Sequence, residues 1–247
     1  MDQIYLPKNR IGMKTGQYVI ISPIEEELRK NIKFRPFFRG ITCIEQLKLT
    51  IIKNIFDILE KENPENIIVT GSFLDKGFKF NDIDLILVKK DNVNLIKLRK
   101  KIEDEFGIQS HIIQIDNKSL IYGISTDPLY NVMLSKSLSK KRMIIREKRR
   151  IDYKILDLNL LKSKSLIDNF DVLNGEEKYY LALNMVSILL FIQNKKLSKK
   201  IVEDYIEEVF NTEIKKIKYN LIEKTKFMKK YKEIYEKTFN LIMENVK

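Results

Sequence analysis

The sequence predicts an α+β fold, in which a mixed sheet with flanking helices is followed by a helical C-terminal domain. Apolar runs of strand length occur at Ile67–Ser72, Asp82–Val88 and Ile108–Ile115. Apolar residues at helical spacing before and between these runs predict helices over Thr42–Glu62 and Asn92–Phe106. Beyond residue 150 the helical spacing continues without another strand pattern, so the chain passes from a mixed class to an all-helical one.

The first 40 residues are predicted to form an N-terminal arm or hairpin. Two prolines and two glycines surround the extended-looking segment Gln17–Ile21. The later segment Lys33–Gly40 mixes basic residues with three phenylalanines. Aromatic faces flanked by arginines can stack on bases, but phenylalanines are also ordinary core residues, so both roles stay open.

Residues 41–145 are assigned to the domain that contains the sheet, and residues 146–247 to the helical domain. In the first, Asp127-Pro128 predicts a turn or a helix start. The second is predicted to hold short, consecutive amphipathic helices, which favours a bundle. Ser198 is a possible N-cap of one of them. Their ranges are Glu176–Gln193, Ser198–Phe210, Glu213–Lys226 and Lys229–Val246.

The composition is that of a chain with a normal core in a reducing compartment. With 247 residues, 44% of them hydrophobic, the chain has enough apolar material to bury a core. The single cysteine, Cys43, excludes an intrachain disulfide and a cysteine-rich zinc site. The N-terminus lacks a signal-peptide pattern, and the longest apolar segment, Tyr179–Ile192, is too short to span a bilayer. These features predict a soluble cytoplasmic protein without a membrane partner.

Two carboxylates interrupt the apolar run that begins at Asp82. Because side chains alternate across a strand, Asp82 and Asp84 should project from the same face. Side by side they repel each other and lose hydration, which is costly unless a cation neutralises them. Oxygen ligands favour Mg²⁺ or Mn²⁺ over zinc. The preceding strand ends in Gly71, where the backbone allows close approach, and Ser72, whose hydroxyl and amide can bind an anion.

The spacing of these residues resembles the motif of the nucleotidyltransferase superfamily typified by DNA polymerase beta. Gly71-Ser72 ends one strand, nine residues intervene, and Asp82-Ile83-Asp84 begins the next. The resemblance covers about residues 42–134, where helices and strands follow in the family's order, and it implies a nucleotidyltransferase-like mixed sheet. It also implies that Asp82 and Asp84 hold Mg²⁺ or Mn²⁺, and that Gly71 and Ser72 seat the phosphates of an NTP.

The third strand departs from the family's pattern, which commonly places a third carboxylate there as general base and metal ligand. His111, the only histidine of the chain, occupies the expected position. A neutral imidazole can accept a proton near pH 7, although a strand histidine bonded to a neighbour is an equally good interpretation. Asp116, five residues on, lies on the opposite strand face unless a bulge re-aims it. Both residues are therefore candidates for the catalytic base.

Basic residues supply the candidate contacts to polyanions. Lys76 and Lys79, between the motif halves, can reach triphosphate oxygens or remain exposed loop lysines. Residues 117–247 carry most of the net charge of +12. This positive charge could bind a phosphate backbone or could simply be solvated surface charge. The candidate nucleic-acid footprint comprises Lys140, Lys141, Arg142, Arg146, Lys148, Arg149 and Arg150.

The sequence therefore predicts a metal-dependent nucleotidyltransferase that transfers NMP from an NTP to a hydroxyl acceptor and releases pyrophosphate. An RNA or DNA end is the expected acceptor. A protein hydroxyl, as in antitoxin-like minimal nucleotidyltransferases, and a small molecule remain open. The alternative from another class is a protein that kept the fold, lost catalysis and binds nucleotide or nucleic acid.

Overall fold

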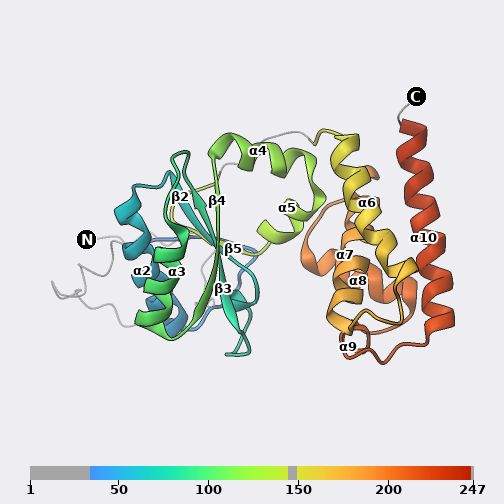
Figure 1. Cartoon of the computed structure of the whole chain (residues 1–247), viewed down its shortest axis with the longest axis horizontal. Helices are drawn as coiled ribbons and strands as arrows, with labels where there is room; N and C mark the ends of the chain where they lie inside the picture. The colour runs from blue at the N-terminus through green and yellow to red at the C-terminus, as the bar shows by residue number, and fades with distance from the viewer. Residues whose placement is uncertain (1–33, 144–148, 246–247) are drawn as a thin grey trace, which may run out of the picture. The chain divides into compact units, whose positions relative to one another are not determined.

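The computed structural model describes residues 34–143 and 149–245, which form a five-stranded mixed sheet and nine α-helices (Figure 1). The fold is therefore α+β, as predicted. The predicted hairpin around Gln17–Ile21 lies outside the described residues. The strands are β1 (Phe37–Arg39), β2 (Asn66–Thr70), β3 (Asp82–Val88), β4 (Gln109–Ile115) and β5 (Ser137–Ser139).

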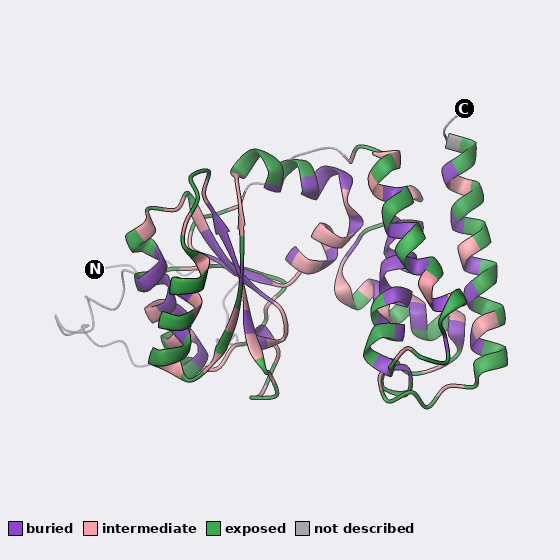
Figure 2. Cartoon of the chain, in the orientation of Figure 1, coloured by how far each residue is buried: buried purple, intermediate pink, exposed green. Residues whose placement is uncertain are grey.

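The strands lie in the order β1-β5-β2-β3-β4, and only β3 and β4 pair in parallel among the described strands. The register places Thr70 opposite Asp84 and Asp84 opposite His111, so these three residues form one row across the sheet. Strands β2 and β3 are mostly buried, as Figure 2 shows, because helices or neighbouring segments cover their apolar side chains. Asp82 and Asp84 are the less buried exceptions on β3.

Local sequence signals explain where the helices near the sheet begin. The Asn94 side chain accepts a hydrogen bond from the amide of Lys97, which caps α3. Asp127 caps α5 in the same way, and Pro128 occupies its first position, where a missing amide proton costs nothing. These helices are α2 (Gln46–Leu59), α3 (Leu95–Phe106), α4 (Asn117–Thr126) and α5 (Pro128–Leu134), with short 3₁₀ turns at η1 (Glu60–Glu62) and η2 (Ser72–Leu74).

The C-terminal part is a helical bundle around α7, which is buried on nearly all sides. Ser198 caps α8 by accepting from the amide of Ile201, as predicted. The single helix predicted over Glu213–Lys226 is wrong, because Asn220 adopts a left-handed conformation (φ 59°) that interrupts it. The bundle helices are α6 (Tyr153–Asp168), α7 (Gly175–Ile192), α8 (Lys199–Phe210), α9 (Ile214–Lys218) and α10 (Lys224–Asn245).

Two short strands have no counterpart in the sequence prediction. Strand β1 lies within the residues assigned to the N-terminal arm, yet Phe38 pairs with Leu138 of β5. Each strand has three residues, too few to show an alternating pattern, and serines flank Leu138. Across residues 34–143 and 149–245, no helix combines the length and the hydropathy that crossing a membrane requires.

Tyr231 of α10 anchors the bundle core through its hydroxyl. The side chain is 0% exposed and its hydroxyl donates to the carbonyl of Ser163 at 2.8 Å. We expect Tyr231→Phe to lower the free energy of unfolding by about 1 kcal/mol at neutral pH, because a buried carbonyl loses a donor. Burial raises the pKa of Tyr231 above its usual 10.0, so the tyrosine stabilises the fold below pH 10 and loses this contribution as pH rises further. Denaturant titrations of both proteins should therefore show a deficit in the variant that shrinks above about pH 10.

Candidate functional site

The two halves of the sequence motif are in direct contact. Gly71, between β2 and η2, has φ 79° and ψ −167°, a region open essentially to glycine alone. A Cβ atom added at Gly71 would lie 2.0 Å from Oδ2 of Asp84. Gly71 is thus required both by its backbone conformation and by the space that the Asp84 carboxylate occupies.

Asp82 and Asp84 lie on one face of β3, as alternation predicts, with the buried Ile83 between them on the other face. The Asp84 side chain is 37% exposed. Burial, together with the negative charge of Asp82, raises the pKa of Asp84, while a hydrogen bond with His111 opposes that rise. The surroundings of Asp84 therefore make its ionised form less favourable than it would be in water.

His111 lies beside Asp84 on the neighbouring strand. Its Nδ1 atom is 3.5 Å from Oδ1 of Asp84, and its side chain is 58% exposed. Because Nδ1 faces the carboxylate, Nε2 is the ring nitrogen left for another partner. The structure therefore brings Gly71, Asp84 and His111 together, with Asp82 next along the same strand face.

A cleft of about 330 Å³ opens at this point. Two of its lysines were missed as site residues by the sequence prediction: Lys136, before β5, and Lys199, at the start of α8. Ser135 helps to place them, because its Oγ accepts a hydrogen bond from the amide of Lys199 at 3.1 Å. Lys136 forms an ion pair with Asp75, which follows η2. The charged and motif residues that line the cleft are Gly71, Asp75, Asp84, His111, Lys136 and Lys199.

An apolar chamber of about 380 Å³ adjoins the cleft. The two spaces share the side chains of Ile86, Ile113, Val132 and Met133. Tyr130 and Tyr180 add aromatic surface to the chamber, so a ligand spanning both spaces would meet charge at one end and apolar rings at the other.

The other predicted nucleotide-binding residues lie nearby or in the adjoining loop. Ser72 is the first residue of η2, and its carbonyl accepts from the amide of Asp75 at 2.9 Å. Lys76 and Lys79 are exposed in the loop that leads to β3 and do not contribute to the lining of the described cleft. The lysines that line it come instead from segments distant in sequence.

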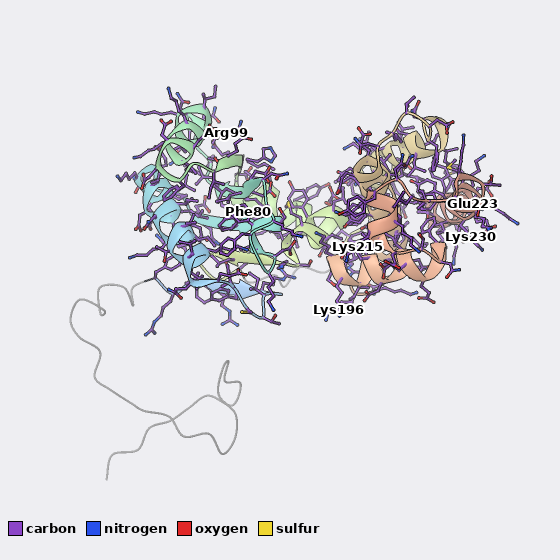
Figure 3. The ribbon with its side chains drawn as sticks, turned by 90° about the horizontal axis from the view of Figure 1, so that it is seen from below. Phe80, Arg99, Lys196, Lys215, Glu223 and Lys230 are labelled. Atoms are coloured by element: carbon purple, nitrogen blue, oxygen red, sulfur yellow. The ribbon has the colours of Figure 1, made fainter. Side chains whose placement is uncertain are left out.

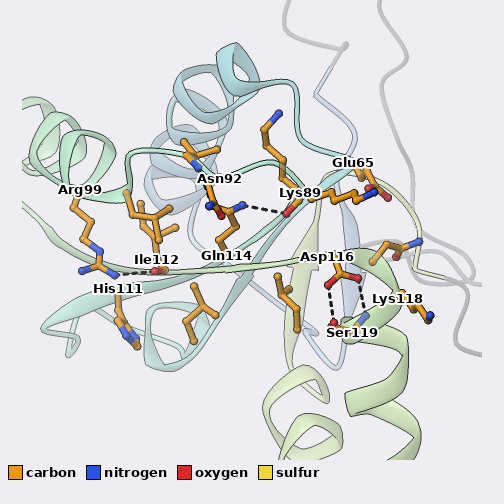
Figure 4. Close-up of a pocket in the computed structure, with 16 residues that line it drawn as sticks. Glu65, Lys89, Asn92, Arg99, His111, Ile112, Gln114, Asp116, Lys118 and Ser119 are labelled. Carbon is orange, nitrogen blue, oxygen red and sulfur yellow. Dashed lines mark hydrogen bonds between the residues drawn. The ribbon is translucent and has the colours of Figure 1, made fainter.

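Asp116 lies at the far end of β4 from His111, beside a groove along this strand (Figure 4). Asp116 is five positions beyond His111, or roughly 16 Å away in an extended strand. The Asp116 carboxylate accepts from the amide and the hydroxyl of Ser119 at 2.9 and 2.6 Å, which caps α4. The structure thus gives Asp116 a capping role and does not bring it to Asp84.

The basic residues proposed as a nucleic-acid footprint are not gathered at the cleft. Lys140 pairs with Glu60, and its amide donates to the carbonyl of Ile67. It is four residues beyond Lys136, or roughly 13 Å away along an extended strand.

Contacts within the chain also engage other members of this group. The backbone amide and carbonyl of Lys141 exchange hydrogen bonds with the Asn66 side chain, while the residue itself is exposed. The guanidinium of Arg149 lies 5.2 Å from the centre of the Phe191 ring. Arg142 and Arg150 are exposed. Arg146 and Lys148 lie outside the described residues.

The carboxylate pair could hold a hard divalent cation. The donors are the carboxylates of two aspartates on one strand face, where burial and the charge of Asp82 raise the pKa of Asp84. Mg²⁺ binds through one or two carboxylates and takes its remaining ligands from water and substrate phosphates. Within residues 34–143 and 149–245, no three His, Cys, Asp or Glu side chains gather closely enough to enclose a metal, so a cation here would depend on such outside ligands.

Comparisons of the chain with protein-family models, with curated proteins and with solved structures find no match.

Proposed function

We propose that the protein is a metal-dependent nucleotidyltransferase of the DNA polymerase beta-like fold. The observation that carries the proposal is the contact of Gly71 with the Asp84 carboxylate. Asp84 is paired in register with His111 on the neighbouring strand. A glycine that makes room for a partly buried, destabilised carboxylate is hard to explain by stability alone, because apolar side chains at these positions would pack at lower cost.

The residues that line the cleft support an NTP as the ligand. The backbone at Gly71, which has no side chain, and the Ser72 hydroxyl would bind phosphate oxygens. Lys136 and Lys199 line the same cleft and would offset phosphate charge. The adjoining apolar chamber, with Tyr130 and Tyr180, would hold the base.

In the proposed reaction Asp82 and Asp84 hold Mg²⁺ or Mn²⁺, and the metal, when bound, neutralises charge on the phosphate oxygens. His111 accepts at Nε2 the proton of the acceptor hydroxyl while Asp84 orients the ring through Nδ1. The hydroxyl oxygen bonds to the alpha phosphorus, and the bond to the beta-phosphate oxygen breaks. The products are the NMP-modified acceptor and pyrophosphate.

The proposal is tested by calorimetric titration with each NTP in the presence of Mg²⁺. Wild-type protein should bind at least one NTP only when the metal is present. The double variant Asp82→Ala/Asp84→Ala should stay folded and lose this binding, because both carboxylates are removed from a partly exposed strand end. Equal binding by both proteins would reject the assignment.

The acceptor is proposed to be an RNA or DNA end, on the ground of the +12 net charge of the chain. In that case nucleic-acid affinity should fall steeply with salt, and less steeply after Arg149 and Arg150 are changed to alanine. Absence of binding at low salt would favour a protein hydroxyl or a small molecule.

A non-catalytic role is the second candidate, because the described residues supply no third carboxylate beside Asp82 and Asp84. Such a protein would bind NTP with Mg²⁺ and release it unchanged, or bind nucleic acid without NTP. Radiolabelled NTP incubated with RNA, DNA and protein acceptors separates these outcomes.

A further inference from the structure

A buried lysine of α2 packs against the segment that connects Gly71-Ser72 with Asp82. Lys48 of α2 is 0% exposed. Its Nζ atom lies 5.6, 5.4 and 5.5 Å from the ring centres of Phe73, Phe78 and Phe80, and Phe80 is labelled in Figure 3. A lysine ammonium over aromatic faces is attracted by their negative electrostatic potential. The three rings all come from residues 73–80, so this segment packs around the ammonium.

The same ammonium makes polar contacts that fix the backbone of this loop. Nζ donates to the carbonyls of Asp75 and Gly77, at 2.5 Å each, and lies 3.2 Å from Oε2 of Glu45. Glu45 in turn accepts the amide proton of Gly77 through Oε1 at 2.6 Å. Hydrogen bonds from the amide of Gly77, from the amide of Glu45 itself and from the Lys48 ammonium lower the pKa of Glu45 to about 2. Both the carbonyl and the amide of Gly77 are therefore held by the start of α2.

A continuous chain of contacts leads from Lys48 to the cleft. The carbonyl of Asp75 binds Lys48, while its carboxylate pairs with Lys136, which lines the cleft with Gly71 and Asp84. The amide of Asp75 also closes η2 by donating to the carbonyl of Ser72. Asp75 thus connects the buried ammonium both to Lys136 and to the Gly71–Ser72 turn, the proposed phosphate-binding segment.

We propose that Lys48 is a positioning residue for nucleotide binding, which acts through Asp75 on Lys136 and on the Gly71–Ser72 turn. This inference rests on the proposed function. Lys48 does not touch the cleft itself, since it is enclosed by α2 and the loop. Its ammonium replaces the solvent contacts that the carbonyls of Asp75 and Gly77 would otherwise need, and so holds the seven-residue loop between η2 and β3, residues 75–81, in one conformation before any ligand binds.

The test compares Lys48→Met with Lys178→Met, which is a matched control from the bundle. Lys178 is also buried, 2% exposed, with Nζ bonded to Asn220 at 2.6 Å and 4.0 Å from the Phe170 ring centre. Both variants should lower the melting temperature. Only Lys48→Met should weaken Mg²⁺-dependent NTP binding, by about tenfold or more, as loss of a residue that orients a binding group commonly does. Hydrogen exchange at the Gly77 amide should also become faster in Lys48→Met alone.

The outcomes separate this inference from the function on which it rests. If wild-type protein binds no NTP, the proposed function and this inference both fall. If wild-type protein binds and Lys48→Met binds with equal affinity, the positioning role alone is overturned. Should Lys48→Met not fold, Glu45→Ala gives the same comparison, because it removes the acceptor of the Gly77 amide from a partly exposed position. Unchanged NTP affinity in Glu45→Ala would then overturn the inference.

Discussion

Gly71→Ala is expected to abolish Mg²⁺-dependent NTP binding while leaving most of the fold in place. The new Cβ atom would lie 2.0 Å from Oδ2 and 3.0 Å from Cγ of Asp84, so either the carboxylate or the β2–η2 turn must move. The backbone conformation at Gly71 adds to the strain, because a residue with a Cβ atom rarely adopts it. Displacement of Asp84 from Asp82 would separate the two proposed metal ligands.

The measurement is calorimetric titration with NTP and Mg²⁺, together with thermal unfolding. Gly107→Ala is the matched control: Gly107 also has a positive φ, of 63°, but a Cβ atom there would meet nothing within 4 Å. Both variants should lose about 1 kcal/mol or more of stability from backbone strain. Only Gly71→Ala should lose nucleotide binding. If Gly71→Ala binds NTP like the control, the contact between the motif halves has no part in binding.

The sequence predicts the elements whose signals are local. Alternation on β3 predicts that Asp82 and Asp84 share a face, and the helical spacing near Ser198 predicts α8 together with its cap. The prediction fails where one residue overrides the pattern, as at Asn220, whose left-handed conformation divides an apparently continuous helix. Periodicity shows which residues are buried but carries no information on a single backbone reversal.

The composition of the cleft is harder to predict, because it depends on contacts between distant segments. Lys136 and Lys199 are 63 positions apart, and both line the cleft because Lys136 precedes β5, which pairs with β2, while the start of α8 packs near Ser135. Lys48 appears in the sequence as one polar residue of an amphipathic helix, and nothing local distinguishes it from a solvated lysine. Its burial follows from three phenylalanines within residues 73–80, which pack around its ammonium.

Asp84→Asn is expected to remove Mg²⁺-dependent NTP binding and yet to leave thermal stability equal to that of the wild type or higher. The raised pKa of Asp84 means that its ionised form is less favourable in the folded state than in the unfolded one, through burial and the neighbouring charge of Asp82. The neutral amide removes that cost at neutral pH while keeping the shape of the side chain. It also removes one charged metal ligand, which should weaken metal-dependent binding by at least about 100-fold.

The sign of the stability change is what separates a functional carboxylate from a structural one. As pH falls toward the raised pKa of Asp84, the wild-type carboxylate gains its proton in the folded state first, so its stability should approach that of Asp84→Asn. Asp116→Asn is the control, since asparagine caps a helix as well as aspartate does and the α4 cap lies far from the cleft. It should change neither NTP binding nor, to any large extent, the melting temperature. A lower melting temperature for Asp84→Asn, with nucleotide binding retained, would mean that Asp84 holds the sheet together and binds no metal.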